Sequence, residues 1–273
     1  MPAVAMQEAT PQLRFATARL ETGPQLRYAE QGDPDGEALV LLHGYSDSWF
    51  SFSRFLPLLP RSYHAYALDQ RGHGDSERPA GGYAIDDFAA DAAAFLDDVG
   101  VDRATIVGHS MGSFVARRVA ETWPERVRRL VLIDSAFTPV NEVMLELGEV
   151  TRTLADPVPP DIAREFQAST VHVPVPEAFF ERVVAECLKA PARVWRSAFE
   201  GLLAFDDAGE LGQIAAPTLL LWGDRDALFS RAEQERLAAA IPDARPMVYP
   251  ETGHCPHWER PERVARDLHA FIH

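Results

Sequence analysis

A serine between two glycines is the first candidate for chemistry in this sequence. Residues 108–112 read Gly-His-Ser-Met-Gly, and they follow the apolar, β-branched run 104–107. Behind them, apolar residues recur at helical spacing as far as Ala120. A turn from strand to helix strains the backbone at the serine, and flanking glycines let the chain pass closely. The pattern therefore predicts that Ser110 presents its hydroxyl at the positive end of a helix dipole.

A base and an acid for this serine are found further along the chain. A serine hydroxyl is a poor nucleophile until a base takes its proton and a carboxylate orients that base. Asp226 comes just after the apolar run 218–222, and His254 comes just after the run 245–249. Strand ends in an open parallel sheet meet at the edge where sites assemble. We therefore expect Ser110, Asp226 and His254 to act together.

Two other aspartates compete for the role of the acid. Asp224 lies two residues before Asp226, in the same turn. Asp134 also follows an apolar run, at 130–133, and could act from there in a variant triad.

Other side chains near these residues have less specific roles. His254, Cys255 and His257 are of metal-ligating types, but adjacent residues cannot easily share one tetrahedral ion without further ligands. We therefore expect no metal. His109 adjoins the nucleophile and is expected to point elsewhere, while Trp49 is the candidate for lining the substrate pocket.

Apolar runs alternate with helical patterns through most of the chain, which predicts a mostly parallel sheet with helices on both faces. Strands are expected at residues 15–20, 25–30, 38–42, 64–68, 104–107, 130–133, 218–222 and 245–249. Helices are expected at residues 48–59, 85–99, 111–122, 231–241 and 264–271. Residues 1–12 are expected to form a loose polar arm.

This alternation breaks between residues 137 and 211. The segment has no convincing buried strand but several short helical patterns, which prolines separate. A structureless segment of this length inside a compact domain would be unusual. We therefore expect a core of residues 1–136 and 212–273, with a helical cap, or lid, inserted at 137–211.

Charge and cysteine content limit the classes of partner. The chain of 273 residues has 26 basic and 41 acidic side chains and a net charge of −15. This argues against nucleic acid and anionic membranes as partners and favours a small neutral substrate. Two cysteines give no disulfide framework, and we see no signal peptide and no apolar membrane span. We expect a cytoplasmic protein.

Five motifs together make this chain resemble the α/β-hydrolase fold family over residues 15–272. They are His-Gly at 43–44, Arg-Gly-His-Gly-Asp-Ser at 71–76, the pentapeptide at 108–112, Gly-Asp-Arg-Asp at 223–226 and Gly-His at 253–254. The resemblance implies a mostly parallel eight-stranded sheet with helices on both faces and an inserted helical cap. It implies that Ser110 is the nucleophile, His254 the general base and then acid, and Asp226 its orienter. The backbone N–H groups of Tyr45 and Met111 would form the oxyanion hole.

Two positions limit which subfamilies of the α/β-hydrolase fold this chain resembles. Related haloalkane dehalogenases and epoxide hydrolases carry an aspartate nucleophile where this chain has Ser110. Dehalogenases usually place a halide-binding tryptophan where it has Met111. The chain looks most like small carboxylesterases, lactonases and cofactor-free haloperoxidases.

This resemblance implies a serine hydrolase that cleaves carboxylic esters of small, largely apolar substrates through an acyl-enzyme intermediate. Its partner would be a small-molecule ester, and it would need no cofactor. Three alternatives stay open: a lactonase, a C–C bond hydrolase of diketones on the same triad, and a ligand receptor with slow turnover.

Overall fold

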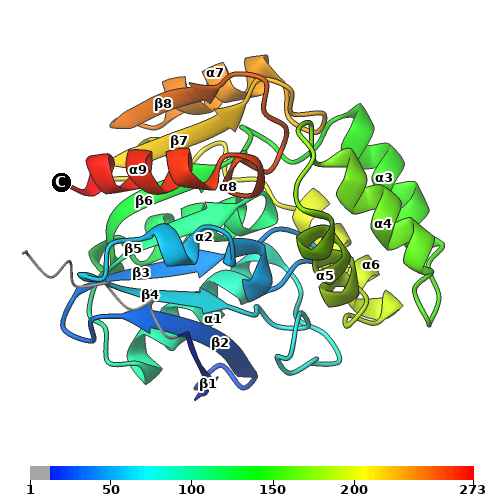
Figure 1. The fold of residues 1–273 in the computed structure, drawn as a ribbon, viewed down its shortest axis with the longest axis horizontal. Helices are drawn as coiled ribbons and strands as arrows, with labels where there is room; N and C mark the ends of the chain where they lie inside the picture. The colour runs from blue at the N-terminus through cyan, green and yellow to red at the C-terminus, as the bar shows by residue number, and fades with distance from the viewer. Residues whose placement is uncertain (1–12) are drawn as a thin grey trace, which may run out of the picture.

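An eight-stranded sheet forms the centre of the protein (Figure 1). The computed structural model describes residues 13–273, so the arm expected at residues 1–12 lies outside the described residues. The strands are β1 (Arg14–Arg19), β2 (Gln25–Gly32), β3 (Glu37–Leu42), β4 (Tyr63–Leu68), β5 (Ala104–His109), β6 (Val127–Ile133), β7 (Thr218–Gly223) and β8 (Ala244–Tyr249). They lie in the order β1-β2-β4-β3-β5-β6-β7-β8.

Most of this sheet is parallel, as the alternating pattern predicts. β2 pairs antiparallel with β1 and with β4, and every other neighbouring pair is parallel. Parallel strands need crossover connections, which the intervening helices provide. The prediction of a mostly parallel eight-stranded sheet with helices on both faces is confirmed.

The central strands are buried on both sides. Every residue of β4, β5 and β7 is buried, which explains why these strands read as continuous apolar runs. Side chains of β3 alternate between two core clusters, with Val40 on one face and Leu41 on the other. The first face is covered by α1 (Ile85–Asp98), α2 (Met111–Thr122) and α7 (Arg231–Ala240), and the second by α9 (Pro261–Ile272).

The prediction of one amphipathic helix at residues 48–59 is wrong. The chain forms two short 3₁₀ helices there, η1 (Trp49–Phe52) and η2 (Leu56–Leu58). Pro57 lies inside this segment and has no N–H to continue an α-helical ladder. Phe52 and Phe55 are nonetheless fully buried. The apolar spacing therefore correctly indicated which side chains are buried, but it did not indicate the type of helix.

Four helices fill the segment between β6 and β7. They are α3 (Glu142–Arg152), α4 (Pro160–Ser169), α5 (Glu177–Cys187) and α6 (Ala192–Leu203). Figure 1 shows them together beside the sheet edge toward which the parallel strands point. The helical character expected for residues 137–211 is thus present, and we propose that this segment acts as the cap of the core.

The last part of the chain returns to the core. Besides α7 and α9, it contains η4 (Leu211–Gln213) and the short helix α8 (Pro256–Glu259), and η3 (Pro124–Arg126) lies earlier in the chain. No helix within residues 13–273 is both long and apolar enough to span a bilayer.

The close packing of α2 on β3 can be tested at Gly112. A Cβ at this position would lie 2.2 Å from the Leu42 carbonyl oxygen and 2.6 Å from that of His43. Glycine to alanine inside a helix usually stabilises by roughly 1 kcal/mol. Here the added carbon meets backbone atoms that cannot swing away, so Gly112→Ala should instead lower the free energy of unfolding by about 1–3 kcal/mol.

Urea unfolding measures this change, and Gly212→Ala in η4 is the control. A Cβ on Gly212 meets nothing within 4 Å, so that variant should stay within about 0.5 kcal/mol of the wild type. Equal stability of Gly112→Ala and the wild type would show that α2 does not pack this closely.

Candidate active site

Ser110 occupies a strained turn between β5 and α2. Its φ is 50° and its ψ is −120°, a left-handed backbone that side-chain-bearing residues rarely adopt. A Cβ on Gly108 would lie 2.1 Å from the Gly112 carbonyl oxygen, so no larger residue fits there. The Ser110 N–H donates to the Ile133 carbonyl at 3.0 Å and ties the turn to β6. The strand, turn and helix that the sequence predicts around Ser110 are all present.

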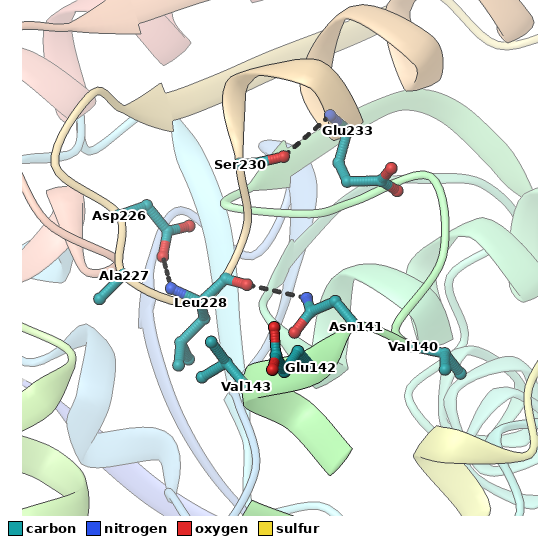
Figure 2. A pocket seen from close by; sticks show the side chains of 9 residues that line it. All are labelled: Val140, Asn141, Glu142, Val143, Asp226, Ala227, Leu228, Ser230 and Glu233. Carbon is teal, nitrogen blue, oxygen red and sulfur yellow. Dashed lines mark hydrogen bonds between the residues drawn. The ribbon is translucent and has the colours of Figure 1, made fainter. Parts of the chain in front are cut away.

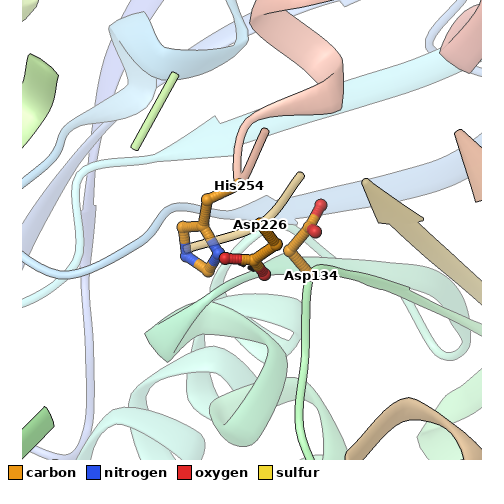
Figure 3. Close-up of side chains that lie close together, drawn as sticks. All are labelled: Asp134, Asp226 and His254. Atoms are coloured by element: carbon orange, nitrogen blue, oxygen red, sulfur yellow. Dashed lines mark hydrogen bonds and ion pairs between the residues drawn. The ribbon is translucent and has the colours of Figure 1, made fainter. Parts of the chain in front are cut away.

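The structure brings His254 and Asp226 into direct contact (Figure 3). His254 Nδ1 and Asp226 Oδ2 lie 2.9 Å apart, and the two side chains are 2% and 0% exposed. Asp226 Oδ1 also accepts from the N–H groups of Leu228 at 2.7 Å and Phe229 at 3.2 Å. Three donors around one buried carboxyl group favour its ionised form.

The second ring nitrogen of His254 is left unpaired. Nε2 is buried and has no hydrogen-bond partner among residues 13–273. Because Nδ1 faces the Asp226 carboxylate, Nδ1 carries the proton in the neutral ring and Nε2 is the acceptor. His254 and Ser110 line the same cavity, so this arrangement offers a base to the serine hydroxyl.

The peptide of His254 is held from two sides. Its N–H donates to the carbonyl of Thr170, just beyond α4, at 2.8 Å. Its carbonyl accepts from His109 Nε2 at 2.9 Å. No local pattern indicates the second contact, because the two residues are 145 positions apart in the chain. His109 therefore points into the site and supports the base, contrary to the expectation that it points elsewhere.

Glu259 of α8 provides a further clamp that the sequence reasoning missed. Its carboxylate accepts from the Gly253 N–H at 2.9 Å and from the Val173 N–H at 2.7 Å. Gly253 precedes His254, and Val173 belongs to the segment between α4 and α5. The loop carrying the base is thus bound to the core and to the proposed cap at once.

The three aspartates that competed for the acid role lie in different places. Asp224 is outside the site, with its carboxylate 3.8 Å from the partly exposed Arg225 guanidinium. Asp226 is the one bonded to His254. Asp134 is fully buried at the end of β6 and has a left-handed φ of 44°. One of its carboxyl oxygens lies within 4.8 Å of an oxygen of Asp226 and a ring nitrogen of His254.

The two backbone groups expected to form the oxyanion hole lie next to the same cavity. Tyr45 lines the cavity, and Met111 is the first residue of α2, beside Ser110. Neither N–H donates to another backbone group within the described chain. The Tyr45 side chain points away, donating its hydroxyl to the Trp195 carbonyl of α6 at 2.9 Å. Ser46, which follows, has a left-handed φ of 60°.

The cavity beside Ser110 is small. It is lined by Gly44, Tyr45, Asp47, His109, Ser110, Phe166, Gln167, Thr170, His254 and Cys255. The space that the centre of a water molecule can occupy is about 10 Å³, close to the least that one water requires. Phe166 and Gln167 of α4, with Thr170 just after it, form the side of this cavity that the proposed cap contributes.

Trp49 is not part of this lining. Its ring packs edge-on against Phe15, with ring centroids 4.9 Å apart, and against Phe50 at 5.6 Å. The backbone N–H of Trp49 donates to Asp69 Oδ1 at 2.7 Å, which fixes the start of η1. We therefore leave Trp49 out of the candidate site.

Two larger hollows lie away from Ser110. One of about 320 Å³ lies outside the Asp226 turn, between residues 140–143 and 226–233 (Figure 2). The Asp226 carboxylate is buried behind its wall and bonds the Leu228 N–H. The other, of about 630 Å³, is lined by residues 156–160 and 188–191. Neither lining includes Ser110 or His254, so we do not assign the chemistry to either.

Asp134, Asp226 and His254 are also the one group of potential metal ligands that lie close enough together within residues 13–273. Asp226 and His254 are already hydrogen-bonded to each other. Cys255 and His257 do not join this group.

Comparison with known proteins identifies the family. Residues 37–261 match the family model described as the alpha/beta hydrolase fold. The chain belongs to the α/β-hydrolase family. Some hydrolases of this family are similar to this chain along nearly their whole length.

Two relatives and one solved structure show the range of similarity. This α/β hydrolase is 29% identical over 270 residues to the 2-hydroxy-6-oxononadienedioate/2-hydroxy-6-oxononatrienedioate hydrolase of Klebsiella pneumoniae, covering 91% of this chain and 93% of that one. It is 30% identical over 284 residues to the non-heme haloperoxidase of Rhodococcus erythropolis, covering 94% and 98%. It is 25% identical to a thermophilic esterase from Thermogutta terrifontis, with a TM-score of 0.83 and coverage of 95% and 98%.

A second buried acid lies in the cavity of this α/β hydrolase. Asp47 accepts hydrogen bonds from Ser51 Oγ at 3.1 Å and from Gln167 Nε2 of α4 at 3.1 Å. Burial raises the pKa of Asp47 from 3.8 to about 7, although these two hydrogen bonds oppose the shift. Asp47 thus joins the loop after β3 to the proposed cap, and its contribution to the free energy of unfolding depends on pH.

This pKa shift predicts a pH-dependent stability that Asp47→Asn should remove. Between about pH 4 and 7 the folded state holds the Asp47 proton more tightly than the unfolded state, so stability falls as pH rises through that window. Relative to Asp47→Asn, the wild type should therefore lose about 2–3 kcal/mol of unfolding free energy between pH 5 and pH 8.

Urea unfolding of both proteins at the two pH values provides the measurement. Asp161→Asn, at an exposed position in the first turn of α4, is the control; it retains Asp47, so its stability should follow that of the wild type at both pH values. A stability difference between wild type and Asp47→Asn that is the same at both pH values would contradict the prediction.

Proposed function

We propose that this α/β hydrolase cleaves carboxylic esters, with Ser110 as nucleophile, His254 as general base and acid, and Asp226 as the group that orients His254. One observation carries this proposal. His254 is bonded through Nδ1 to a buried carboxylate and lines the same cavity as Ser110, while its Nε2 has no hydrogen-bond partner among residues 13–273. A serine hydroxyl needs such an oriented base beside it to become a nucleophile.

The first half of the reaction forms an acyl-enzyme. Ser110 Oγ attacks the ester carbonyl carbon while its proton passes to His254 Nε2. The carbonyl electrons move onto oxygen, and the N–H groups of Tyr45 and Met111 would stabilise that charge; losing one such donor costs about 3 kcal/mol in typical cases. The tetrahedral intermediate collapses, the C–O bond to the alcohol breaks, and His254 returns the proton to the leaving oxygen.

The second half uses water in the same way. His254 takes a proton from water, the hydroxide attacks the acyl carbon, and the ester bond to Ser110 breaks as its oxygen regains the proton. The carboxylic acid then leaves. No further redox partner or cofactor enters this balance. The two cysteines are buried and unpaired, which supports the proposal of a reducing, cytoplasmic location.

Substitution of Ser110 tests the nucleophile directly. Ser110→Ala should lower kcat/KM on p-nitrophenyl acetate and butyrate by at least about a thousandfold, because no group remains to form the acyl-enzyme. Ser113→Ala, at a buried serine in the first turn of α2, is the matched control and should stay within about tenfold of the wild type.

A fluorophosphonate provides a second readout of the same site. One equivalent should add to the peptide that contains Ser110 and abolish activity. Full wild-type turnover by Ser110→Ala, or labelling at another residue, would overturn the assignment.

The small cavity predicts the preferred acyl group. Esters with acyl chains of about two to four carbons should give kcat/KM at least tenfold higher than esters with eight or more, since a longer chain must displace more of residues 166–170. A panel of p-nitrophenyl esters measures this ratio. Faster hydrolysis of the long chains would show that the small cavity does not limit the substrate.

The same panel should include the alternative substrates. The similarity to the 2-hydroxy-6-oxononadienedioate/2-hydroxy-6-oxononatrienedioate hydrolase of Klebsiella pneumoniae supports testing C–C bond cleavage of a diketone. A lactone tests the remaining enzymatic alternative. A kcat/KM on either that exceeds the best ester would replace the ester assignment. Turnover below about one per minute on every compound would favour a ligand receptor.

A further inference from the structure

We propose that Asp134 is a positioning residue of the triad: an uncharged carboxyl group that fixes the turn bearing Asp226 and that takes over the negative charge when Asp226 cannot carry it. This proposal rests on the triad proposed above. Figure 3 shows Asp134 on the far side of Asp226 from His254 in that view. The mechanism described above gives Asp134 no role.

Asp134 connects the end of β6 to the end of β7. Its N–H donates to the Leu221 carbonyl at 2.8 Å, and its Oδ1 accepts from the Gly223 N–H at 3.0 Å. The Gly223 carbonyl in turn accepts from the Asp226 N–H at 3.0 Å. Asp134 therefore holds the first residue of the turn that presents Asp226 to His254.

The two carboxyl groups are too close and too buried for both to be ionised. An oxygen of each lies within 4.8 Å of the other, and both side chains are completely inaccessible to solvent. Without a cation between them, two such groups share one charge, as in paired carboxylates generally.

Hydrogen bonding decides which of the two keeps the charge. Asp226 accepts from three donors, whereas Asp134 accepts only from Gly223, and its Oδ2 is buried without a partner among the described residues. An ionised carboxylate with an unpartnered buried oxygen would be costly. Burial and the adjacent Asp226 charge accordingly raise the pKa of Asp134 well above 3.8.

The surrounding groups do not change this assignment. Glu259 is the next acidic group and also disfavours a charge on Asp134. His109 and His257 pack near His254, and burial lowers the pKa of both, so neither supplies a cation. His254 lies within 4.8 Å of both acids, and it already pairs with Asp226.

This assignment predicts that the cost of Asp134→Asn depends on the residue at position 226. Asparagine keeps an acceptor for the Gly223 N–H and tolerates a left-handed φ. In the wild type it replaces one neutral group by another, so kcat/KM should change less than threefold. In Asp226→Asn the repelling charge is gone and Asp134 can ionise beside His254, so adding Asp134→Asn should then cost at least tenfold.

The pH profile gives a readout that a purely structural role would not move. Asp134→Asn should leave the acid limb of the wild-type kcat/KM profile in place. If Asp134 were ionised, the substitution would remove a negative charge near His254 and shift that limb to lower pH. Such a shift, or an equal cost of Asp134→Asn in both backgrounds, would overturn the proposal.

Two further measurements keep the test decisive. The single variant Asp226→Asn should gain activity with rising pH, beyond the pH at which the wild-type profile is flat, because Asp134 must lose its proton first. No such gain would overturn the proposal even if Asp134→Asn failed to fold. Asp224→Asn, a partly exposed aspartate in the same turn, is the control in both backgrounds.

Failure of this inference is distinguishable from failure of the triad. If Ser110→Ala retained activity, the proposed function itself would be wrong. If Ser110→Ala were inactive but Asp134→Asn gave equal losses in both backgrounds, only the role of Asp134 would fall. Loss of wild-type activity in EDTA, with recovery on adding Zn²⁺, would assign the two acids to a metal and would likewise overturn the proposal.

Discussion

The close approach of α2 to the middle of the sheet is the constraint on which the rest of the site depends. Gly112 lies directly against the Leu42 backbone, and Gly108 lies against Gly112. The chain can turn this sharply only if Ser110 accepts a left-handed backbone. That turn places Ser110 between the end of β5 and the first residue of α2.

The proposed base, His254, is held by both the core and the proposed cap. His109 and Glu259 bond residues 253–254 from the core, while Thr170 bonds His254 and Val173 bonds Glu259 from the segment between α4 and α5. Thr170 also lines the cavity beside Ser110. The same residue therefore contacts both His254 and the space that a substrate of the proposed reaction would occupy.

Much of this arrangement could be predicted from local patterns. Apolar runs gave the strands, and the residues just after them, Ser110, Asp226 and His254, are brought to one edge because parallel strands end there. The contacts of His109 with the His254 carbonyl join residues far apart in the chain, and no periodicity encodes them. The helix expected at residues 48–59 failed for a local reason, since Pro57 interrupts its hydrogen bonds while its apolar spacing remains helical.

The residues with left-handed backbone in the described chain affect which substitutions could stabilise this protein. Ser46, Ser110, Asp134 and Glu251 are the non-glycine examples, and each follows a strand of the sheet. Residues in such sparsely populated backbone regions each cost on the order of 1–3 kcal/mol. The buried strands offset that cost at the edge where the reacting groups meet. Selection for thermal stability alone would therefore first replace these strained residues, and the gain in stability would lower the activity of the proposed site.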